Sequence, residues 1–194
     1  YGRTGKMFAS EHFGLEPDII VLGKAIASGM PLSAIVSRRE ILESWNSPAH
    51  FFNTAGNAVS CSASIATINV IKDEELIRNT NKQGNYILDR FKSIMDKYEC
   101  IGDVRGKGLF IGIDIVKNRE TKERDITKTA KICWRCWERG LILAFFSGSV
   151  LRVAPPLILN SQEAERAMDI IEKSILEVED GLVSDEVLKE IKGW

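Results

Sequence analysis

One lysine stands where covalent chemistry is possible. Four branched apolar residues, Ile19–Leu22, predict a strand that is covered on both faces. Gly23 permits a tight turn, and Lys24 follows at once. The lysine amine is therefore expected at the carboxyl end of the strand, the edge at which open α/β sheets bind ligands. Near low-dielectric walls a lysine can become a nucleophile toward a carbonyl carbon. The alternative is a solvated lysine that merely follows a strand.

A second charged residue, Arg152, lies within the apolar stretch 150–156. Because an unpaired buried charge is costly, we expect this guanidinium to have an anionic partner. The partner is either an internal carboxylate or the carboxylate of a substrate, which a guanidinium can bind through two parallel hydrogen bonds. The sequence leaves both alternatives open.

Two short motifs invite other chemistry. The glycine-rich stretch 102–108 is one residue too short for a phosphate-binding loop, and Gly108 stands where such a loop needs Ser or Thr for magnesium. We expect a turn between strands there. Cys133 and Cys136 have the spacing of a zinc or redox pair, but the other two cysteines form no second pair of that spacing. A structural role is expected for both, and no metal site is predicted.

The composition narrows the class of function. The chain has 194 residues, of which 44% are hydrophobic and 27% are charged, enough to bury a core. Its formal net charge of -1, with acids and bases interspersed, predicts no nucleic-acid partner and no membrane partner. The amino end has no apolar signal core, so a cytoplasmic location with reduced cysteines is the default expectation.

The pattern of elements predicts α/β organisation in the first part and α+β organisation in the second. We expect strands at 19–22, 32–37, 109–116, 141–144 and 150–153, and helices at 38–45, from 58 onward, and at 73–98, 126–139, 161–178 and 185–192. Residues 46–57 are expected to form a loop, and 117–125 a charged turn.

Several residues should fix the ends and faces of these helices. Asp73 is expected to cap the helix 73–98, and Gly140 to end the helix 126–139 in a left-handed conformation. Asn160 or Ser161 should cap the last long helix. The helix 126–139 should place one apolar stripe against a core, formed by Ile126, Ala130, Cys133, Trp134 and Trp137.

Six stretches, in this order, resemble the class III pyridoxal-phosphate aminotransferases, which include the ornithine, acetylornithine and 4-aminobutyrate enzymes. They are Gly2-Arg3-Thr4-Gly5-Lys6-Met7-Phe8-Ala9, Glu11-His12-Phe13-Gly14, Glu16-Pro17-Asp18-Ile19-Ile20, 23–34, 101–112 and 151–156. The resemblance implies a fold type I architecture. Residues 1–72 would be the carboxyl-terminal part of the large cofactor domain, 73–98 an interdomain helix, and 99–194 a small α+β domain.

The resemblance also implies roles for single residues. Lys24 would hold pyridoxal 5′-phosphate as a Schiff base and move a proton at the substrate α-carbon. Arg152 would bind the substrate α-carboxylate. The loop 53–57 would reach across a homodimer, whose active site lies at the interface, to the cofactor phosphate. Asn53 takes the place of the family's phosphate-binding Thr, and Thr54 stands one residue later. Either side chain could donate a hydrogen bond to a phosphate oxygen.

The implied reaction is transamination between an amino acid, or an ω-amino acid, and a 2-oxo acid. Two alternatives remain, namely racemisation or epimerisation with the same cofactor, and a non-catalytic fragment that only dimerises. The family's phosphate loop, its ring-stacking aromatic residue and the aspartate of its pyridine nitrogen precede the point that corresponds to Tyr1. We therefore expect a fragment, with the activity belonging to the whole protein.

Overall fold

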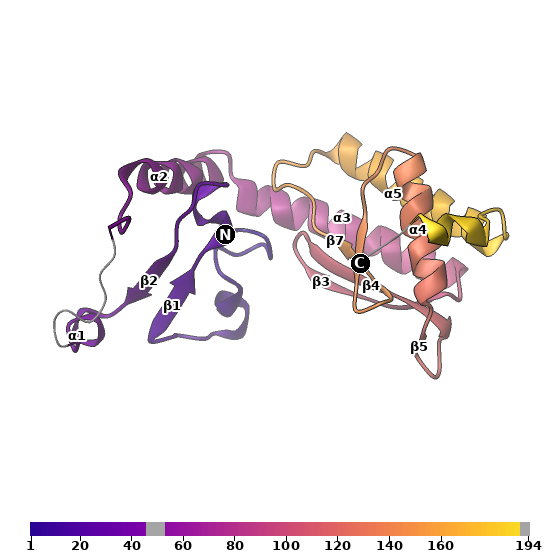
Figure 1. Ribbon diagram of the computed structural model, residues 1–194, viewed down its shortest axis with the longest axis horizontal. Coiled ribbons are helices and arrows are strands. Elements are labelled where there is room, and N and C mark those ends of the chain that lie inside the picture. The colour runs from indigo at the N-terminus through magenta and orange to yellow at the C-terminus, as the bar shows by residue number, and fades with distance from the viewer. Residues whose placement is uncertain (46–52, 191–194) are drawn as a thin grey trace. The chain divides into compact units, whose positions relative to one another are not determined.

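The computed structural model describes residues 1–45 and 53–190, and the chain divides into two compact units (Figure 1). The first unit comprises residues 1–2 and 6–77, and the second comprises residues 3–5 together with the chain from 78 onward. Helix α3 (Leu76–Lys97) lies almost wholly in the second unit. Residues 46–52 of the expected loop, and the last two residues of the expected helix 185–192, lie outside the described residues.

The first unit contains a small antiparallel sheet and helices. Strand β1 (Ile19–Leu22) pairs with β2 (Ala34–Ser37), and Leu22 lies opposite Ala34. The helical segments are η1 (Ala9–Phe13), η2 (Lys24–Ala27), α1 (Arg39–Leu42) and α2 (Ala58–Asp73). Helix α2 starts where its sequence predicts, because the Asn57 side chain accepts a hydrogen bond from the Ser60 backbone N–H at 3.1 Å.

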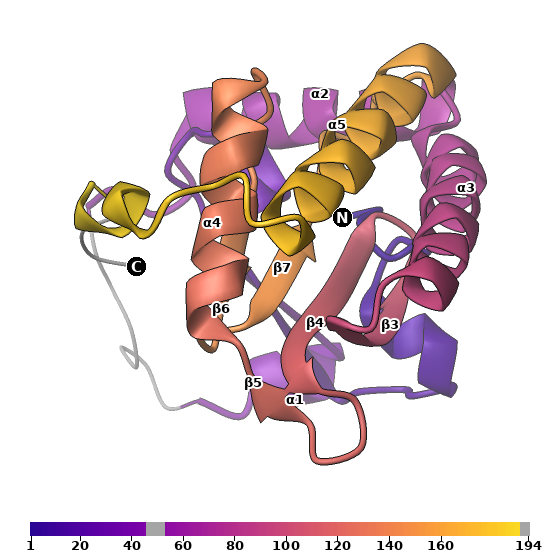
Figure 2. The ribbon, with the colours of Figure 1, turned by 90° about the vertical axis from the view of Figure 1, so that its right-hand side faces the viewer.

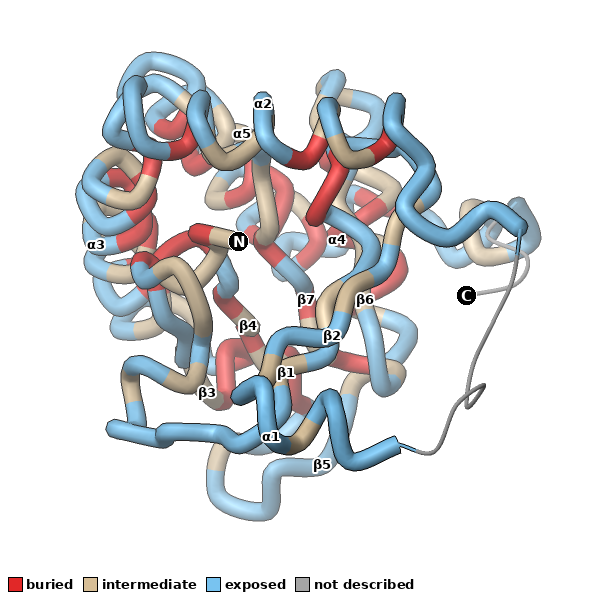
Figure 3. Tube along the Cα trace, turned by 90° about the vertical axis from the view of Figure 1, so that its left-hand side faces the viewer, coloured by how far each residue is buried: buried red, intermediate tan, exposed pale blue. Residues whose placement is uncertain are grey.

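The strand at 19–22 is confirmed, but its expected burial on both faces is wrong in this chain. Ile19 is 50% exposed and Val21 is 75% exposed. Figure 3 shows exposed and intermediate residues along β1 and β2, and neither strand has a buried residue. Within the described ranges β1 pairs with β2 alone, and a two-stranded sheet is too narrow to bury both of its faces.

The second unit is an antiparallel sheet with helices on one face (Figure 2). The strands are β3 (Ile101–Lys107), β4 (Phe110–Asn118), β6 (Ala144–Phe146) and β7 (Val150–Val153), in the order β3-β4-β7-β6, and the short β5 (Glu123–Arg124) pairs with β4. The helices are α3, α4 (Ile126–Glu138), α5 (Ser161–Glu179) and the short η3 (Asp185–Lys189). The predicted combination of an α/β part and an α+β part is confirmed.

The core lies between this sheet and its helices. Along β4 the side chains of Ile111, Ile113 and Ile115 are buried, whereas Gly112 and Asp114 alternate with them on the opposite face. Burial of each such isoleucine contributes about 1.5–3 kcal/mol. The helices add further fully buried side chains, among them Phe91, Ile132 and Met168. The face of the sheet that carries Gly112 is therefore left open for other contacts.

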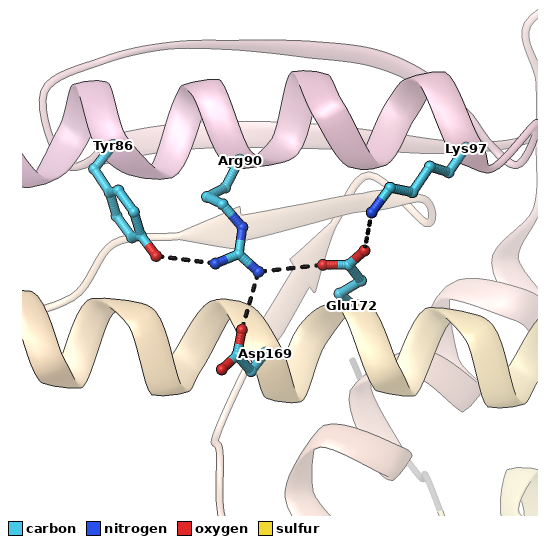
Figure 4. Close-up of polar contacts among 5 residues, drawn as sticks. All are labelled: Tyr86, Arg90, Lys97, Asp169 and Glu172. Atoms are coloured by element: carbon cyan, nitrogen blue, oxygen red, sulfur yellow. Dashed lines mark hydrogen bonds and ion pairs between the residues drawn. The ribbon is translucent and has the colours of Figure 1, made fainter.

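Helices α3 and α5 are tied together by a polar network (Figure 4). Arg90 of α3 donates to Asp169 at 3.0 Å, to Glu172 at 3.2 Å and to the Tyr86 hydroxyl at 2.9 Å. Lys97 donates to Glu172 at 2.7 Å. Because the two carboxylates belong to α5, the network fixes the helix that contributes Met168 to the core.

Two predicted connections are wrong. Residues 102–107 belong to β3 and not to a turn, because β3 stays in register with β4 up to the pair Lys107↔Phe110. The turn is a two-residue connection that begins with Gly108, whose φ of +54° suits such tight turns. Asp73 does not cap α3, because α2 continues through Asp73 and α3 begins only after Glu75, which has a φ of +49°.

The carboxyl end of α4 explains why the strand expected at 141–144 begins later. Gly140 has a φ of +82° and donates to Trp137 at 2.9 Å, and Leu141 donates to Cys136 at 2.9 Å, which together form a left-handed helix end. The predicted cap at Gly140 is confirmed. The same geometry uses the backbone of Leu141, so the strand expected at 141–144 is wrong and β6 begins at Ala144.

The predicted apolar stripe of α4 is wrong in part. Ala130 and Cys133 are buried as expected, but Ile126 is 57% exposed and Trp137 is 58% exposed. The side of the helix that faces the core also includes Thr129, Ile132 and Cys136. The buried face of α4 therefore differs from the predicted stripe. It includes Ile132 and Cys136, and it leaves out Ile126 and Trp137 at the two ends of the stripe.

Candidate functional site

Lys24 directly follows the connection from β1. It is the first residue of η2 and has a φ of +52°, in the left-handed region that residues with a Cβ rarely adopt. Holding it there costs about 1 kcal/mol, and such conformations persist where the surrounding structure enforces them. Here Ile26 and Ala27 of η2 are buried, and the hydroxyls of Ser28 and Thr67 lie 3.0 Å apart. Helix α2 therefore anchors the segment that presents the lysine.

The Lys24 side chain is exposed and forms no ion pair with any residue in the described part of the chain. Residues 1–45 and 53–190 do not supply the low-dielectric walls expected around it. An accessible amine without a carboxylate partner, fixed at the end of a strand, nevertheless fits a cofactor that presents an aldehyde. The residue thus meets the chemical requirement for holding pyridoxal phosphate.

Asn53 and Thr54 lie in the turn that leads into α2. Both are exposed, and Gly56 between them and the helix has a φ of +64°. The turn ends at the amino terminus of a 16-residue helix, where backbone N–H groups and the helix dipole favour an anion. The amide of Asn53 and the hydroxyl of Thr54 can both donate to a phosphate oxygen. Either assignment stays a prediction.

Arg152 lies on β7 and is exposed rather than buried. The internal ion pair considered for it is not formed with any described residue. Its guanidinium carbon lies 5.1 Å from the centre of the Phe146 ring and 5.6 Å from that of Phe110. Across the sheet Arg152 is paired with Gly112, which has no side chain, and with Ala144, which has only a methyl group. The charge is thus oriented by aromatic faces and free to accept an anion.

A groove of about 560 Å³ adjoins Arg152. It is mostly apolar, and its walls include Leu143, Phe146, Pro155 and Met168. Its acid, Glu163, accepts a hydrogen bond from the Asn160 backbone N–H at 3.0 Å and so serves the cap of α5. Such a groove suits a ligand that has a carboxylate at one end and an apolar group at the other.

Arg3 is a functional candidate that the sequence alone did not reveal. Its guanidinium donates to the carbonyl of Pro155, three residues beyond Arg152. Burial lowers the pKa of Arg3, and the positive charge of Arg152 lowers it further. The only signal in the sequence is that Arg3 belongs to one of the stretches that carry the family resemblance.

The cysteine pair behaves as packing. Cys133 and Cys136 are buried, and desolvation raises the pKa of Cys133 to about 12 and that of Cys136 to about 11. Neither thiol is therefore a thiolate near neutral pH, which a metal ligand or a redox nucleophile would need to be. Within the described ranges, His, Cys, Asp and Glu do not gather into any group of three or more that could hold a metal ion.

None of the described helices has the length and apolar character to span a membrane.

The expected site residues divide between the units. The first unit carries Lys24, Asn53 and Thr54, which the resemblance assigns to the cofactor, and the second carries Arg152, which it assigns to the substrate.

Comparisons with known proteins identify the family. The family sequence model for aminotransferase class-III matches residues 1–175. The chain is 47% identical over 193 residues to a leucine/methionine racemase of Thermococcus litoralis, covering 100% of this chain and 44% of that protein. It is 45% identical over 189 residues to an alanine/serine racemase of Pyrococcus horikoshii, covering 96% of this chain and 39% of that protein. A crystal structure of a Bacillus anthracis aminotransferase superposes with a TM-score of 0.85 at 33% identity, covering 91% of this chain and 42% of that one.

The chain spans less than half the length of these relatives. It belongs to the class III aminotransferase family, whose cofactor is pyridoxal 5′-phosphate, and it has the α/β fold of a part of that family's proteins.

Proposed function

We propose that the whole protein to which this chain belongs racemises or epimerises an apolar amino acid with the help of pyridoxal 5′-phosphate. The observation that carries the proposal is the level of identity. The two relatives named as racemases share 47% and 45% of their residues with nearly the entire chain, against 33% for the aminotransferase structure. The mostly apolar groove beside Arg152 supports an apolar side chain in the substrate.

Lys24 is the residue that we assign to the cofactor and to proton transfer. When bound, pyridoxal phosphate supplies the electron sink that makes the hydrogen on the substrate α-carbon acidic. The Lys24 amine would remove that proton or return one to the same carbon. Racemisation further requires a second base on the opposite face, because a single base restores the original configuration.

Arg152 is assigned to the α-carboxylate of the same substrate, as the resemblance implies. A guanidinium binds a carboxylate through two parallel hydrogen bonds. The rings of Phe110 and Phe146 lie beside its guanidinium, and these contacts would reduce the side-chain freedom that is lost on binding. Asn53 or Thr54 would bind the cofactor phosphate. A homodimer with the active site at its interface, and a cytoplasmic location, complete the proposal.

The experiment is a chiral assay without any amino acceptor. The whole protein, saturated with pyridoxal phosphate, is incubated with L-leucine in D₂O and no 2-oxo acid. We expect D-leucine to form and both enantiomers to carry deuterium at the α-carbon. Absence of D-leucine from a protein that does bind the cofactor would overturn the proposal.

Transamination is the second candidate, and the family model and the Bacillus anthracis structure favour it. In that case L-leucine would keep its configuration, and a 2-oxo acid acceptor would be converted into its amino acid at the rate at which leucine is consumed. A protein that only dimerises would do neither and would bind no cofactor.

A further inference from the structure

The short segment 3–5 is built into the second unit. The Leu109 backbone N–H donates to the Arg3 carbonyl at 3.0 Å, and the Asn81 side chain donates to the Gly5 carbonyl at 2.9 Å. A Cβ on Gly5 would lie only 2.0 Å from the Asn81 side-chain oxygen. The backbone of Arg3 is therefore fixed against the β3–β4 turn and α3.

The Arg3 side chain extends from this fixed backbone to the groove beside β7. Its guanidinium donates to the carbonyl of Pro155, and both Pro155 and Arg152 line the groove. One hydrogen bond to a carbonyl leaves most of the five guanidinium donors available. Neither arginine has a carboxylate partner among the residues that the structure describes, so the two positive charges remain uncompensated.

The two charges affect each other. The positive charge of Arg152, after burial, lowers the pKa of Arg3. Their mutual repulsion is unfavourable as long as no anion is near, and a bound carboxylate would relieve it. Two guanidiniums, one lining the groove and one bound to the Pro155 carbonyl in its wall, would thus favour a carboxylate more than Arg152 alone.

We propose that Arg3 is a positioning residue for the carboxylate that Arg152 binds. It holds the chain just beyond Arg152 through the carbonyl of Pro155, and it adds a second positive charge beside the same anion. The inference deepens the proposed function and rests on it in the assignment of Arg152 to the carboxylate and in the choice of ligand, a monocarboxylate with an apolar tail.

The test measures binding and needs no turnover. The probe is 4-methylpentanoate, which has the carbon skeleton of leucine without its amine, and the neutral comparison is 4-methylpentanamide. Both are titrated calorimetrically into the whole protein saturated with cofactor, as wild type and as Arg3→Gln, Arg3→Lys and Arg124→Gln. Arg124 is an exposed arginine on β5, so its variant controls for the loss of one charge.

We expect Arg3→Gln to weaken binding of the acid about tenfold, Arg3→Lys to recover most of the loss, and Arg124→Gln to change it less than twofold. Binding of the amide should not change. In an Arg152→Ala background the effect of Arg3→Gln should shrink to less than twofold, because the carboxylate is no longer held there.

Three results would overturn the inference: unchanged binding of the acid by Arg3→Gln, an equal loss for acid and amide, or no binding of the acid by the wild-type protein. Thermal unfolding of each variant separates a loss of folding from a loss of binding. The chiral assay with leucine decides the proposed function separately, so the two can fail independently.

Discussion

Arg152 on β7 is paired across the sheet with Gly112 on β4. The glycine has no side chain, and the next residue of β4 on the same face, Phe110, contributes the ring beside the guanidinium. The open face of the sheet therefore carries an oriented, uncompensated positive charge. No described residue forms an ion pair with Arg152, and we propose that it binds the substrate carboxylate instead.

Replacing this guanidinium should affect the substrate and spare the cofactor. Arg152→Ala removes two charge-assisted hydrogen bonds, worth about 2–3 kcal/mol, so the KM for the amino acid should rise about 30- to 140-fold. Arg152→Lys should restore only part of the loss, because an ammonium cannot form the paired contact. Steady-state kinetics give KM, and the absorbance of the bound cofactor should stay at its wild-type strength. An unchanged KM would remove the carboxylate role of Arg152.

Lys24 should be required for the covalent attachment of the cofactor. The whole protein should show a visible absorption band with pyridoxal phosphate, and Lys24→Ala should abolish it because no amine remains to condense with the aldehyde. Lys72→Ala, at an exposed lysine of α2, is the matched control and should keep the band. A band of equal strength in Lys24→Ala would show that another group holds the cofactor.

Local signals accounted for much of the fold. The left-handed Gly140 and the strand before Lys24 each depend on a few neighbouring residues, and both were predicted. The cap of α5 was predicted at Asn160 or Ser161, and the structure places it at Asn160. The exposure of Val21 was not predictable, because burial depends on what lies over a strand and not on its own residues.

In the site, too, the features that depend on residues distant in the sequence could not be predicted. Arg152 drew attention because of its apolar neighbours, yet the structure leaves it exposed on the open face of the sheet. The contact between Arg3 and Pro155 joins residues that are 152 positions apart in the sequence, and no short sequence pattern predicts it. The prediction for Asp73 was wrong because the residue belongs to the last turn of α2, and α3 begins only at Leu76.

Two glycines with similar backbone angles should differ sharply in their tolerance of a methyl group. Gly108 has a φ of +54°, and a Cβ there would lie 2.6 Å from the Thr4 backbone carbon. Gly140 has a φ of +82° and open space around it. Gly140→Ala should cost about 1 kcal/mol of unfolding free energy, from strain alone, and Gly108→Ala about 2–4 kcal/mol, because backbone must also move. Urea unfolding measures both, and equal costs would show that segment 3–5 does not pack tightly on Gly108.

Stability in acid should depend on Glu177. Hydrogen bonds from Arg139 and then Arg135 lower the pKa of this carboxyl from 4.5 to about 2. Since the folded state holds the proton less tightly than the unfolded state, the stabilisation is complete above pH 4.5 and is lost as the pH falls from there toward 2. Urea unfolding at a series of pH values should show a shallower loss over this interval for Glu177→Gln than for wild type. Glu120→Gln, at an exposed carboxyl in the β4–β5 turn, should keep the wild-type slope, and an unchanged slope in Glu177→Gln would contradict the assignment.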